Sequence, residues 1–305
     1  MLRRNVLIFH QAALGDFIVT WPLAMALSRI MPQSRIIYVT HSQKGKLAER
    51  VLRVESTDGE SGWHSLLTDS PQLPERNAKL LEAAQVVVSF TAGQSDALAE
   101  AVVRLAPEAK VISLDTRREG AGHVSDSLLE QLAESVVLSK AMEQMLRSIA
   151  SRGAGYRLAP QAGSVVIHPG AGKEANRWPA ERFVELARRL GGAGKKVRIL
   201  LGEVEMERWP ASLVGELEQV ADVKQPQTLV DLVDEIASAA AFVGNDSGPG
   251  HLAGILGVPT LSLFGPSDPV RWRPLGPVVH VLRADPIADI TVESVYTEVG
   301  KLTGG

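Results

Sequence analysis

The feature that most constrains the fold lies near the C-terminal end of the chain, where two apolar runs each end in a polar, glycine-rich turn. The first run, 239–243, leads into Gly-Asn-Asp-Ser-Gly at 244–248, and a helical pattern follows. The second run, 258–264, leads into Gly-Pro-Ser-Asp-Pro at 265–269. A strand, a tight turn, a helix and a second strand form the repeating unit of a parallel α/β sheet. Both turns are therefore expected at one edge of such a sheet.

The turn that opens the helix is also a candidate site for an anion. Asp246 and Ser247 are residue types that cap helix N-termini well, and the small residues after them let a ligand approach the backbone. A helix N-terminus offers free N–H groups and a partial positive charge, which suit a phosphate or diphosphate. A capped turn without any ligand is the alternative. The candidate binding residues of this turn are Asp246, Ser247, Gly248, Pro249 and Gly250.

Length and composition limit the classes of protein to consider. A chain of 305 residues suggests two domains. The net charge of −3 argues against general nucleic-acid binding, so no nucleic-acid partner is expected. The absence of cysteine excludes disulfides and thiolate chemistry and agrees with a reducing compartment. The apolar run of four residues before His10 is too short for a signal peptide or a membrane span, so we expect a cytoplasmic protein.

A glycine- and proline-rich segment at 153–163 divides two series of alternating strand and helix patterns. Such alternation predicts parallel sheets wound by right-handed crossovers. We therefore predict an α/β protein with two Rossmann-like domains, 1–155 and 156–305, facing each other across a cleft. A final amphipathic helix from 290 is expected to pack back toward the first domain. The strands are predicted at 6–9, 35–39, 86–90, 110–114, 164–168, 196–201 and, more weakly, 220–223, in addition to the two runs above.

Two further turns carry candidate chemistry. Asp16 follows the first strand and lies in the first turn of the next helix, where a carboxylate can act as a general base or merely stabilise the helix start. After the strand at 164–168 comes a glycine-rich loop, 168–179, which is neither GxGxxG nor a P-loop. Lys173 and Arg177 in this loop are candidate partners of a phosphate.

Together the three motifs resemble glycosyltransferase family 9, the lipopolysaccharide heptosyltransferases and their relatives. The resemblance rests on LGDFIVTWP, HPGAGKEANRWPAERFVELA and GNDSGPGHLAGILGVPTLSLFGPSDPVRW, in the order and at the separation of the family. It implies a GT-B fold with an N-terminal acceptor domain and a C-terminal donor domain. It also implies an ADP-activated heptose donor and inversion at the anomeric carbon without a metal.

The resemblance assigns roles to individual residues. It places Asp246 near the donor sugar, the Ser247 and Gly248 backbone at the phosphates, and Glu205 at the ribose. His251 is either a phosphate or acceptor contact or a histidine that packs the helix. The chain departs from the family at Asn176, where a lysine is usual, at His10, where a basic residue is common, and at Pro249, where leucine is common.

The residue types in the chain also indicate a reaction without a metal, in which a carboxylate takes up the proton. No Asp-x-Asp pair occurs in the chain, so nothing indicates a carboxylate pair that would hold Mg²⁺ at a diphosphate. The leaving diphosphate would then be neutralised by backbone N–H groups and by Lys173 or Arg177. Asp16 would remove the proton of the attacking hydroxyl. No cofactor and no metal are expected.

The sequence thus predicts an enzyme that takes a nucleotide sugar and a glycan or glycolipid acceptor of the lipopolysaccharide type. Peripheral contact with the inner face of the inner membrane is left open. Two alternatives remain: a non-catalytic binder of nucleotide sugars or glycans on the same scaffold, and another GT-B enzyme such as a nucleotide-sugar 2-epimerase.

Overall fold

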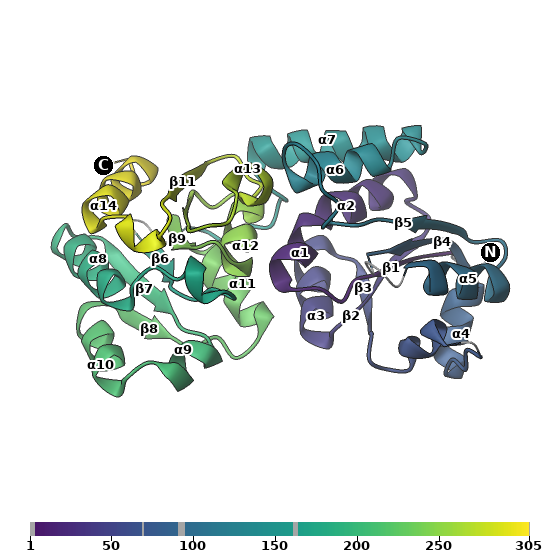
Figure 1. Ribbon diagram of the computed structural model, residues 1–305, viewed down its shortest axis with the longest axis horizontal. Helices are drawn as coiled ribbons and strands as arrows, with labels where there is room; N and C mark the ends of the chain where they lie inside the picture. The colour runs from purple at the N-terminus through teal and green to yellow at the C-terminus, as the bar shows by residue number, and fades with distance from the viewer. Residues whose placement is uncertain (1–3, 69, 91–94, 161–163, 305) are drawn as a thin grey trace. The chain divides into compact units, whose positions relative to one another are not determined.

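The computed structural model describes residues 4–68, 70–90, 95–160 and 164–304 (Figure 1). It divides into two compact units, Met1–Arg147 and Ser148–Gly305. Each unit contains one parallel sheet with helices packed against it. None of the helices in the described ranges is both long and apolar enough to cross a membrane.

The first unit is built on a parallel sheet with the strand order β3-β2-β1-β4-β5. The strands predicted at 6–9, 35–39, 86–90 and 110–114 are confirmed, whereas β3 was not predicted. The strands are β1 (Asn5–Phe9), β2 (Arg35–Thr40), β3 (Glu55–Asp58), β4 (Ala84–Ser89) and β5 (Lys110–Ser113). The helices are α1 (Leu14–Val19), α2 (Trp21–Ile30), α3 (Ser42–Leu52), η1 (Trp63–Leu67), α4 (Glu75–Glu82), α5 (Ser95–Leu105), α6 (Val124–Gln131) and α7 (Val136–Arg152).

The second unit has a parallel sheet with the strand order β11-β10-β9-β6-β7-β8. Here the edge strand β11 was not predicted. The strands are β6 (Ser164–His168), β7 (Lys196–Leu200), β8 (Asp222–Lys224), β9 (Ala241–Asn245), β10 (Thr260–Phe264) and β11 (Val279–Arg283). The helices are η2 (Glu174–Asn176), α8 (Ala180–Gly192), α9 (Glu203–Arg208), α10 (Ala211–Val220), α11 (Leu229–Ala237), α12 (Gly248–Leu256), α13 (Pro269–Trp272), η3 (Ile287–Asp289) and α14 (Val292–Leu302).

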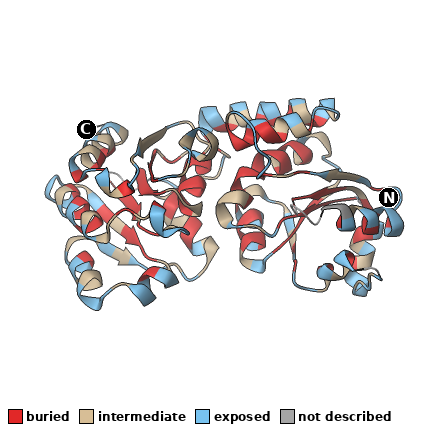
Figure 2. Ribbon diagram, in the orientation of Figure 1, coloured by how far each residue is buried: buried red, intermediate tan, exposed pale blue. Residues whose placement is uncertain are grey.

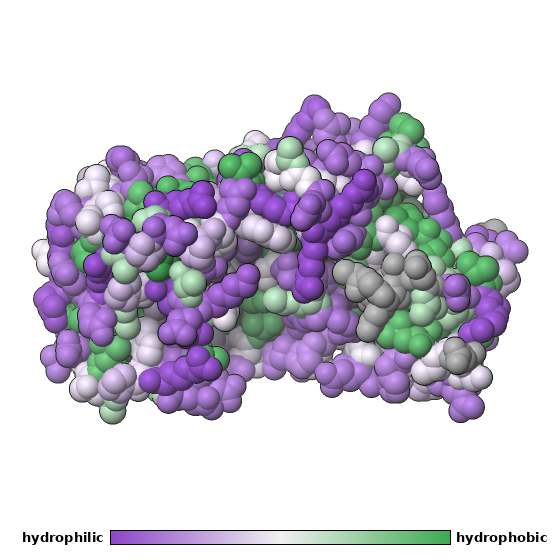
Figure 3. All heavy atoms as spheres, viewed as in Figure 1, coloured by the Kyte–Doolittle hydropathy of each residue, from purple (hydrophilic) through white to green (hydrophobic). Residues whose placement is uncertain are grey.

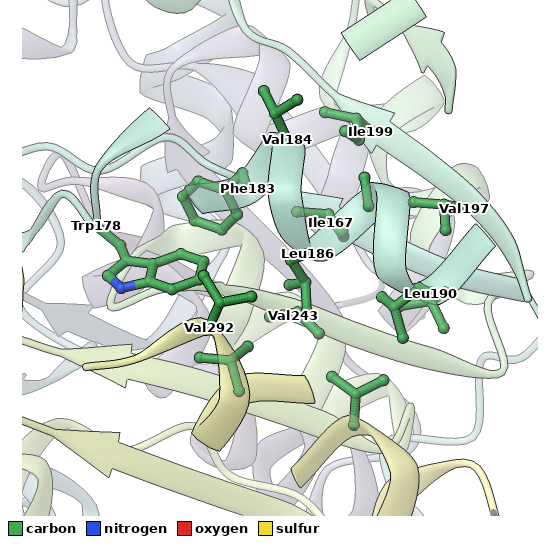
Figure 4. Close-up of a cluster of buried hydrophobic side chains, with 14 of the residues drawn as sticks. Ile167, Trp178, Phe183, Val184, Leu186, Leu190, Val197, Ile199, Val243 and Val292 are labelled. Carbon is green, nitrogen blue, oxygen red and sulfur yellow. The ribbon is translucent and has the colours of Figure 1, made fainter. Parts of the chain in front are cut away.

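The central strands β9 and β10 of the second unit are buried along their whole length because both faces of its sheet are covered. Such burial is typical of a parallel sheet between two helix layers. On one face, Phe183 and Leu186 of α8 and Val292 of α14 pack against Ile167 and Val243 of the sheet (Figure 4). Buried residues follow the strands, and exposed residues lie on the outer sides of the helices (Figure 2). The same outer sides give this unit a largely hydrophilic surface on the face drawn in Figure 3.

The division between the units falls inside α7, between Arg147 and Ser148, whereas the predicted domains meet at 155/156. The last turn of α7 belongs to the second unit because it is tied to the end of α12. The Ala154 N–H donates to the Ile255 carbonyl at 2.7 Å, and Gly153 adopts φ +75° against the backbone of Leu256 and Gly257. The final helix α14 packs against α8 of its own unit. The predicted boundary and the return of this helix to the first domain stay predictions.

The contact of Gly153 with the end of α12 gives a prediction for stability. A Cβ at Gly153 would lie 2.7 Å from the Gly257 nitrogen, whereas a Cβ at Gly155, which also has a positive φ, would meet nothing within 4 Å. Gly155→Ala should therefore cost about 1–2 kcal/mol for the left-handed backbone alone. Gly153→Ala should cost about 1–3 kcal/mol more through overpacking. Urea unfolding of both variants measures the difference in their free energies of unfolding. Equal losses would show that the backbone at Leu256 and Gly257 moves to accommodate the added methyl group.

Candidate donor-binding site

Three loops meet at the carboxyl edge of the sheet in the second unit. They follow β6, β9 and β10, which are neighbours in the sheet. Because the carboxyl ends of adjacent parallel strands share one edge, these loops bring residues from distant parts of the sequence together, at the kind of position where open α/β sheets bind ligands.

Asn245, the last residue of β9, fixes the loop that follows β6. Its side chain is fully buried. The Nδ2 atom donates to the Pro169 carbonyl at 2.6 Å, and Oδ1 accepts from the Trp178 N–H at 3.1 Å. Trp178 is itself anchored, since its indole Nε1 donates to the Ile290 carbonyl at 2.8 Å. One amide therefore holds both ends of the 169–178 loop. The helix after this loop begins at Ala180, with Pro179 at its N-cap.

Asp246 is the point on which all three loops converge. Its Oδ2 accepts from Ser267 Oγ at 2.7 Å and from Asn176 Nδ2 at 3.3 Å. Burial raises the pKa of the Asp246 carboxyl, against the opposing effects of the Ser267 hydrogen bond and the positive charge of Lys173. Sequence reasoning did not select Ser267, although its Gly-Pro-Ser-Asp-Pro turn was recognised as the end of the second apolar run. Two neutral side chains therefore donate hydrogen bonds to this carboxyl group, and the exposed Lys173 adds a positive charge nearby.

The start of α12 lies directly after Asp246. Ser247 is its N-cap residue, but its side chain makes no capping hydrogen bond, and its buried Oγ finds no hydrogen-bond partner among the described residues. The residues that follow, Gly248, Pro249, Gly250 and His251, form the first turn, and the last three of them are buried. A helix end with an unused cap hydroxyl and small residues provides a cradle for an anion.

A cavity of about 300 Å³ lies between the loop after β6 and α9. It is lined by Arg177 and Trp178 of the loop and by Glu205 and Arg208 of α9, with Trp209 at the C-cap of that helix. Glu205 is buried and accepts from the Gly202 N–H at 3.0 Å. Arg177 is oriented by donation from Nε to the Ala171 carbonyl at 3.0 Å. The cavity therefore combines an aromatic wall, a cation and a carboxylate that can accept hydroxyl hydrogen bonds.

Glycine at 170 lets the loop approach this carboxylate. A Cβ at Gly170 would lie 2.6 Å from His168 Cε1 and 2.9 Å from Glu205 Oε1. His168, at the end of β6, is half-buried. Desolvation of its ring lowers its pKa, although the charge of Glu205 opposes this. In the sequence this loop is glycine-rich but follows neither GxGxxG nor the P-loop pattern. The structure explains the glycine at position 170 by the close packing of the loop against the Glu205 side chain.

The structure thus brings together most of the residues predicted for the second domain. Asn176, Asp246 and Lys173 form one group, Arg177 and Glu205 line the adjacent cavity, and Ser247 to His251 form the helix start. The described residues contain no group of three His, Cys, Asp or Glu side chains arranged to hold a metal ion.

Asp16 belongs to the other unit. It lies half-buried in the first turn of α1, after the loop that follows β1. Ala13 at the N-cap of α1 makes no side-chain cap, so a carboxylate in this turn also suits the helix dipole. His10, just before the loop, is fully buried between the rings of Phe17 and Phe90, with centroids 5.2 and 5.6 Å away.

Comparison with known proteins begins with sequence. Residues 131–298, more than half of the chain, match the family model of glycosyltransferase family 9 (heptosyltransferase). Lipopolysaccharide heptosyltransferase 1 from Pseudomonas aeruginosa is 37% identical over 110 residues, which make up 36% of this chain and 31% of that protein. The chain thus spans about a third of the length of this curated relative.

Solved structures resemble the chain over nearly its full length. A glycosyltransferase family 9 structure from Veillonella parvula has a TM-score of 0.73 at 20% identity, covering 99% of this chain and 98% of that one. The E. coli heptosyltransferase WaaC with ADP has a TM-score of 0.72 at 20% identity, covering 98% and 99%. These likenesses, with the two parallel sheets, confirm the predicted α/β GT-B class with two Rossmann-like domains. By the match to the family model, the chain belongs to glycosyltransferase family 9.

Proposed function

We propose that this protein is an inverting, metal-independent glycosyltransferase that transfers a sugar, heptose from ADP-heptose, to a lipopolysaccharide-type or other glycan acceptor. The observation that carries the proposal is the convergence of three loops on Asp246, beside a helix start whose cap hydroxyl is unused. Family membership supports the reaction class, and the solved relative with ADP supports the choice of nucleotide.

In this proposal the donor diphosphate binds at the first turn of α12. The N–H groups there and the buried Ser247 hydroxyl supply hydrogen bonds, and the helix end supplies partial positive charge. Asp246 accepts hydrogen bonds from hydroxyls of the donor sugar. The ribose of the nucleotide lies toward Glu205 and its cavity, where a buried carboxylate can accept from vicinal hydroxyls.

Lys173 takes the place of the lysine that the family usually carries at position 176. The Asn176 side chain is buried and donates to Asp246, and a Cβ at Gly265 would lie 3.1 Å from its Oδ1, so this side chain is packed rather than extended. Lys173 is exposed at the tip of the same loop, and its charge acts on Asp246. It can therefore reach a diphosphate in front of Asp246. One such donor is worth about 10²- to 10³-fold in rate.

Asp16 is the general base of the proposed reaction. The acceptor hydroxyl loses its proton to the Asp16 carboxylate as its oxygen attacks the anomeric carbon. The bond from that carbon to the diphosphate oxygen breaks, and its electron pair leaves with ADP. Attack opposite the leaving group inverts the anomeric configuration. Backbone N–H groups and Lys173 stabilise the leaving diphosphate, so the step as proposed uses neither a metal nor another cofactor.

The partners follow from the same proposal. They are a nucleotide sugar and a glycan or glycolipid acceptor, with no nucleic acid. We place the reaction in the cytoplasm. Because lipopolysaccharide-type acceptors are lipids, the proposal includes peripheral contact with the inner face of the inner membrane.

The helix start gives the first functional prediction. Gly248→Leu should weaken ADP binding at least about tenfold, a loss of roughly 1.4 kcal/mol, because the side chain would occupy the diphosphate cradle. Gly215→Leu on α10 is the matched control, since a Cβ there meets nothing within 4 Å. Isothermal titration calorimetry measures both. Unchanged ADP affinity in the first variant would place the phosphates elsewhere.

Asp246 gives a prediction about pH and stability. Its pKa is raised in the folded protein by burial, so the folded state binds this proton more tightly than the unfolded state. The stability contribution of Asp246 therefore falls as the pH rises from the ordinary range of an aspartate through the raised pKa, and stays low above it. Asp246→Asn should melt higher than wild type at pH 7.5, with the difference vanishing near pH 3, while transfer activity is lost. Melting curves at both pH values decide, and a variant that melts lower at pH 7.5 would contradict the assignment.

The role of Asp16 gives the third prediction. Asp16→Asn should lower kcat about 10²- to 10⁴-fold and leave ADP affinity nearly unchanged, because the donor is assigned to the other unit. If Asp16 only stabilises the start of α1, the same change costs about 1 kcal/mol or less and activity falls only with the folded fraction. Turnover and melting temperature measured on one preparation separate the two roles. A wild-type protein that binds ADP but transfers no sugar would instead indicate a binding protein.

A further inference from the structure

Lys44 is a buried cation in an electrostatically unfavourable place. It is the third residue of α3 (Ser42–Leu52), in the first helical turn, where the helix carries partial positive charge that disfavours a lysine. The residue is nevertheless only 9% exposed, although lysine is almost never fully buried unless paired. Helix stability therefore does not explain this residue, and a compensating partner is required.

The partner lies on the loop between β1 and α1. Lys44 Nζ donates to the Ala12 carbonyl at 2.6 Å and sits 5.8 Å from the centroid of the Phe17 ring. These contacts place the ammonium over the loop and the first turn of α1, on either side of Asp16 in the sequence. Burial lowers the pKa of Lys44, and the negative charge of Asp16 opposes that change. The buried ammonium and the Asp16 carboxylate thus stabilise each other.

His10 faces the same group but contributes no charge. Burial lowers its pKa to about 3, and the charge of Lys44 acts in the same direction. At neutral pH the ring is therefore uncharged, and it packs between two phenylalanines. His10 lies next to the Asp16 backbone, whereas Lys44 interacts with the Asp16 charge. Lys44 therefore brings a positive charge to Asp16 from α3, and the histidine after β1 brings none.

We propose that Lys44 is a positioning residue that holds the Asp16 carboxylate ionised and oriented for proton transfer. This inference rests on the proposed role of Asp16 as the general base. Through its bond to the Ala12 carbonyl, Lys44 also fixes the loop that leads into α1. Its long side chain reaches the loop from a different element, so it can set the direction of the carboxylate without touching the substrate.

The pH profile of transfer tests this role. Lys44→Met keeps the length of the side chain and removes the charge, so the ionised form of Asp16 loses its stabilisation. The acidic limb of kcat/KM should move up by about one pH unit, while ADP affinity stays unchanged. Lys44→Arg should keep the wild-type limb. Lys46→Met on the exposed side of the same helix is the matched control and should move nothing. An unmoved limb in an active Lys44→Met variant would overturn the proposal.

A double-mutant cycle on melting temperature tests the pairing without any assay of transfer. If the two charges stabilise each other, Lys44→Met should change the melting temperature more favourably in the Asp16→Asn background than in wild type, because the carboxylate is no longer left without its cation. Additive changes would overturn the pairing. If the cycle shows coupling but the wild-type protein transfers no sugar, the pairing of Lys44 with Asp16 is supported and the proposed function is contradicted.

Discussion

The two hydrogen bonds of the Asn245 side chain are the interaction on which the site in the second unit depends. They join the end of β9 to both ends of the loop after β6. Because Asn176 and Lys173 lie on that loop and Asp246 follows Asn245, one buried amide sets the spacing of the whole group. Its removal would leave a buried N–H and a buried carbonyl unsatisfied, at about 1–3 kcal/mol each. β9 thus contributes to the core of the sheet through its buried strand and to the geometry of the sheet edge through the Asn245 side chain.

Within each of its two units the protein keeps polar groups in states that the fold alone does not favour. The Asp246 carboxyl is buried enough to raise its pKa, the Ser247 hydroxyl has no partner among the described residues, and Lys44 is a buried cation at the wrong end of a helix. Each of these costs free energy in the unliganded protein. Such costs are expected where side chains are held for a ligand or a proton transfer rather than for stability.

The sequence allowed the central strands to be predicted, but not the edges of the sheets. β6, β9 and β10 are buried on both faces and read as apolar runs. β3 is Glu-Ser-Thr-Asp at an edge, with exposed residues at both ends, and β11 is half-buried along most of its length, so neither shows a clear period. Asp246 and Ser247 were predictable because a turn and a helix start are local patterns. Ser267 and Lys44 were not, since their roles arise from contacts with Asp246 and Ala12, 21 and 32 residues away along the chain.

The proposed chemistry requires that ADP leave only when an acceptor attacks, and without a metal. The most direct measurement is release of ADP from ADP-heptose in excess EDTA, with and without a lipopolysaccharide-type acceptor that lacks the transferred sugar. The expected result is release that depends on the acceptor and is unchanged by EDTA. Release without the acceptor would indicate hydrolysis, and loss of release in EDTA would show that a metal, rather than Lys173 and the start of α12, stabilises the leaving diphosphate; either result would contradict the proposed mechanism.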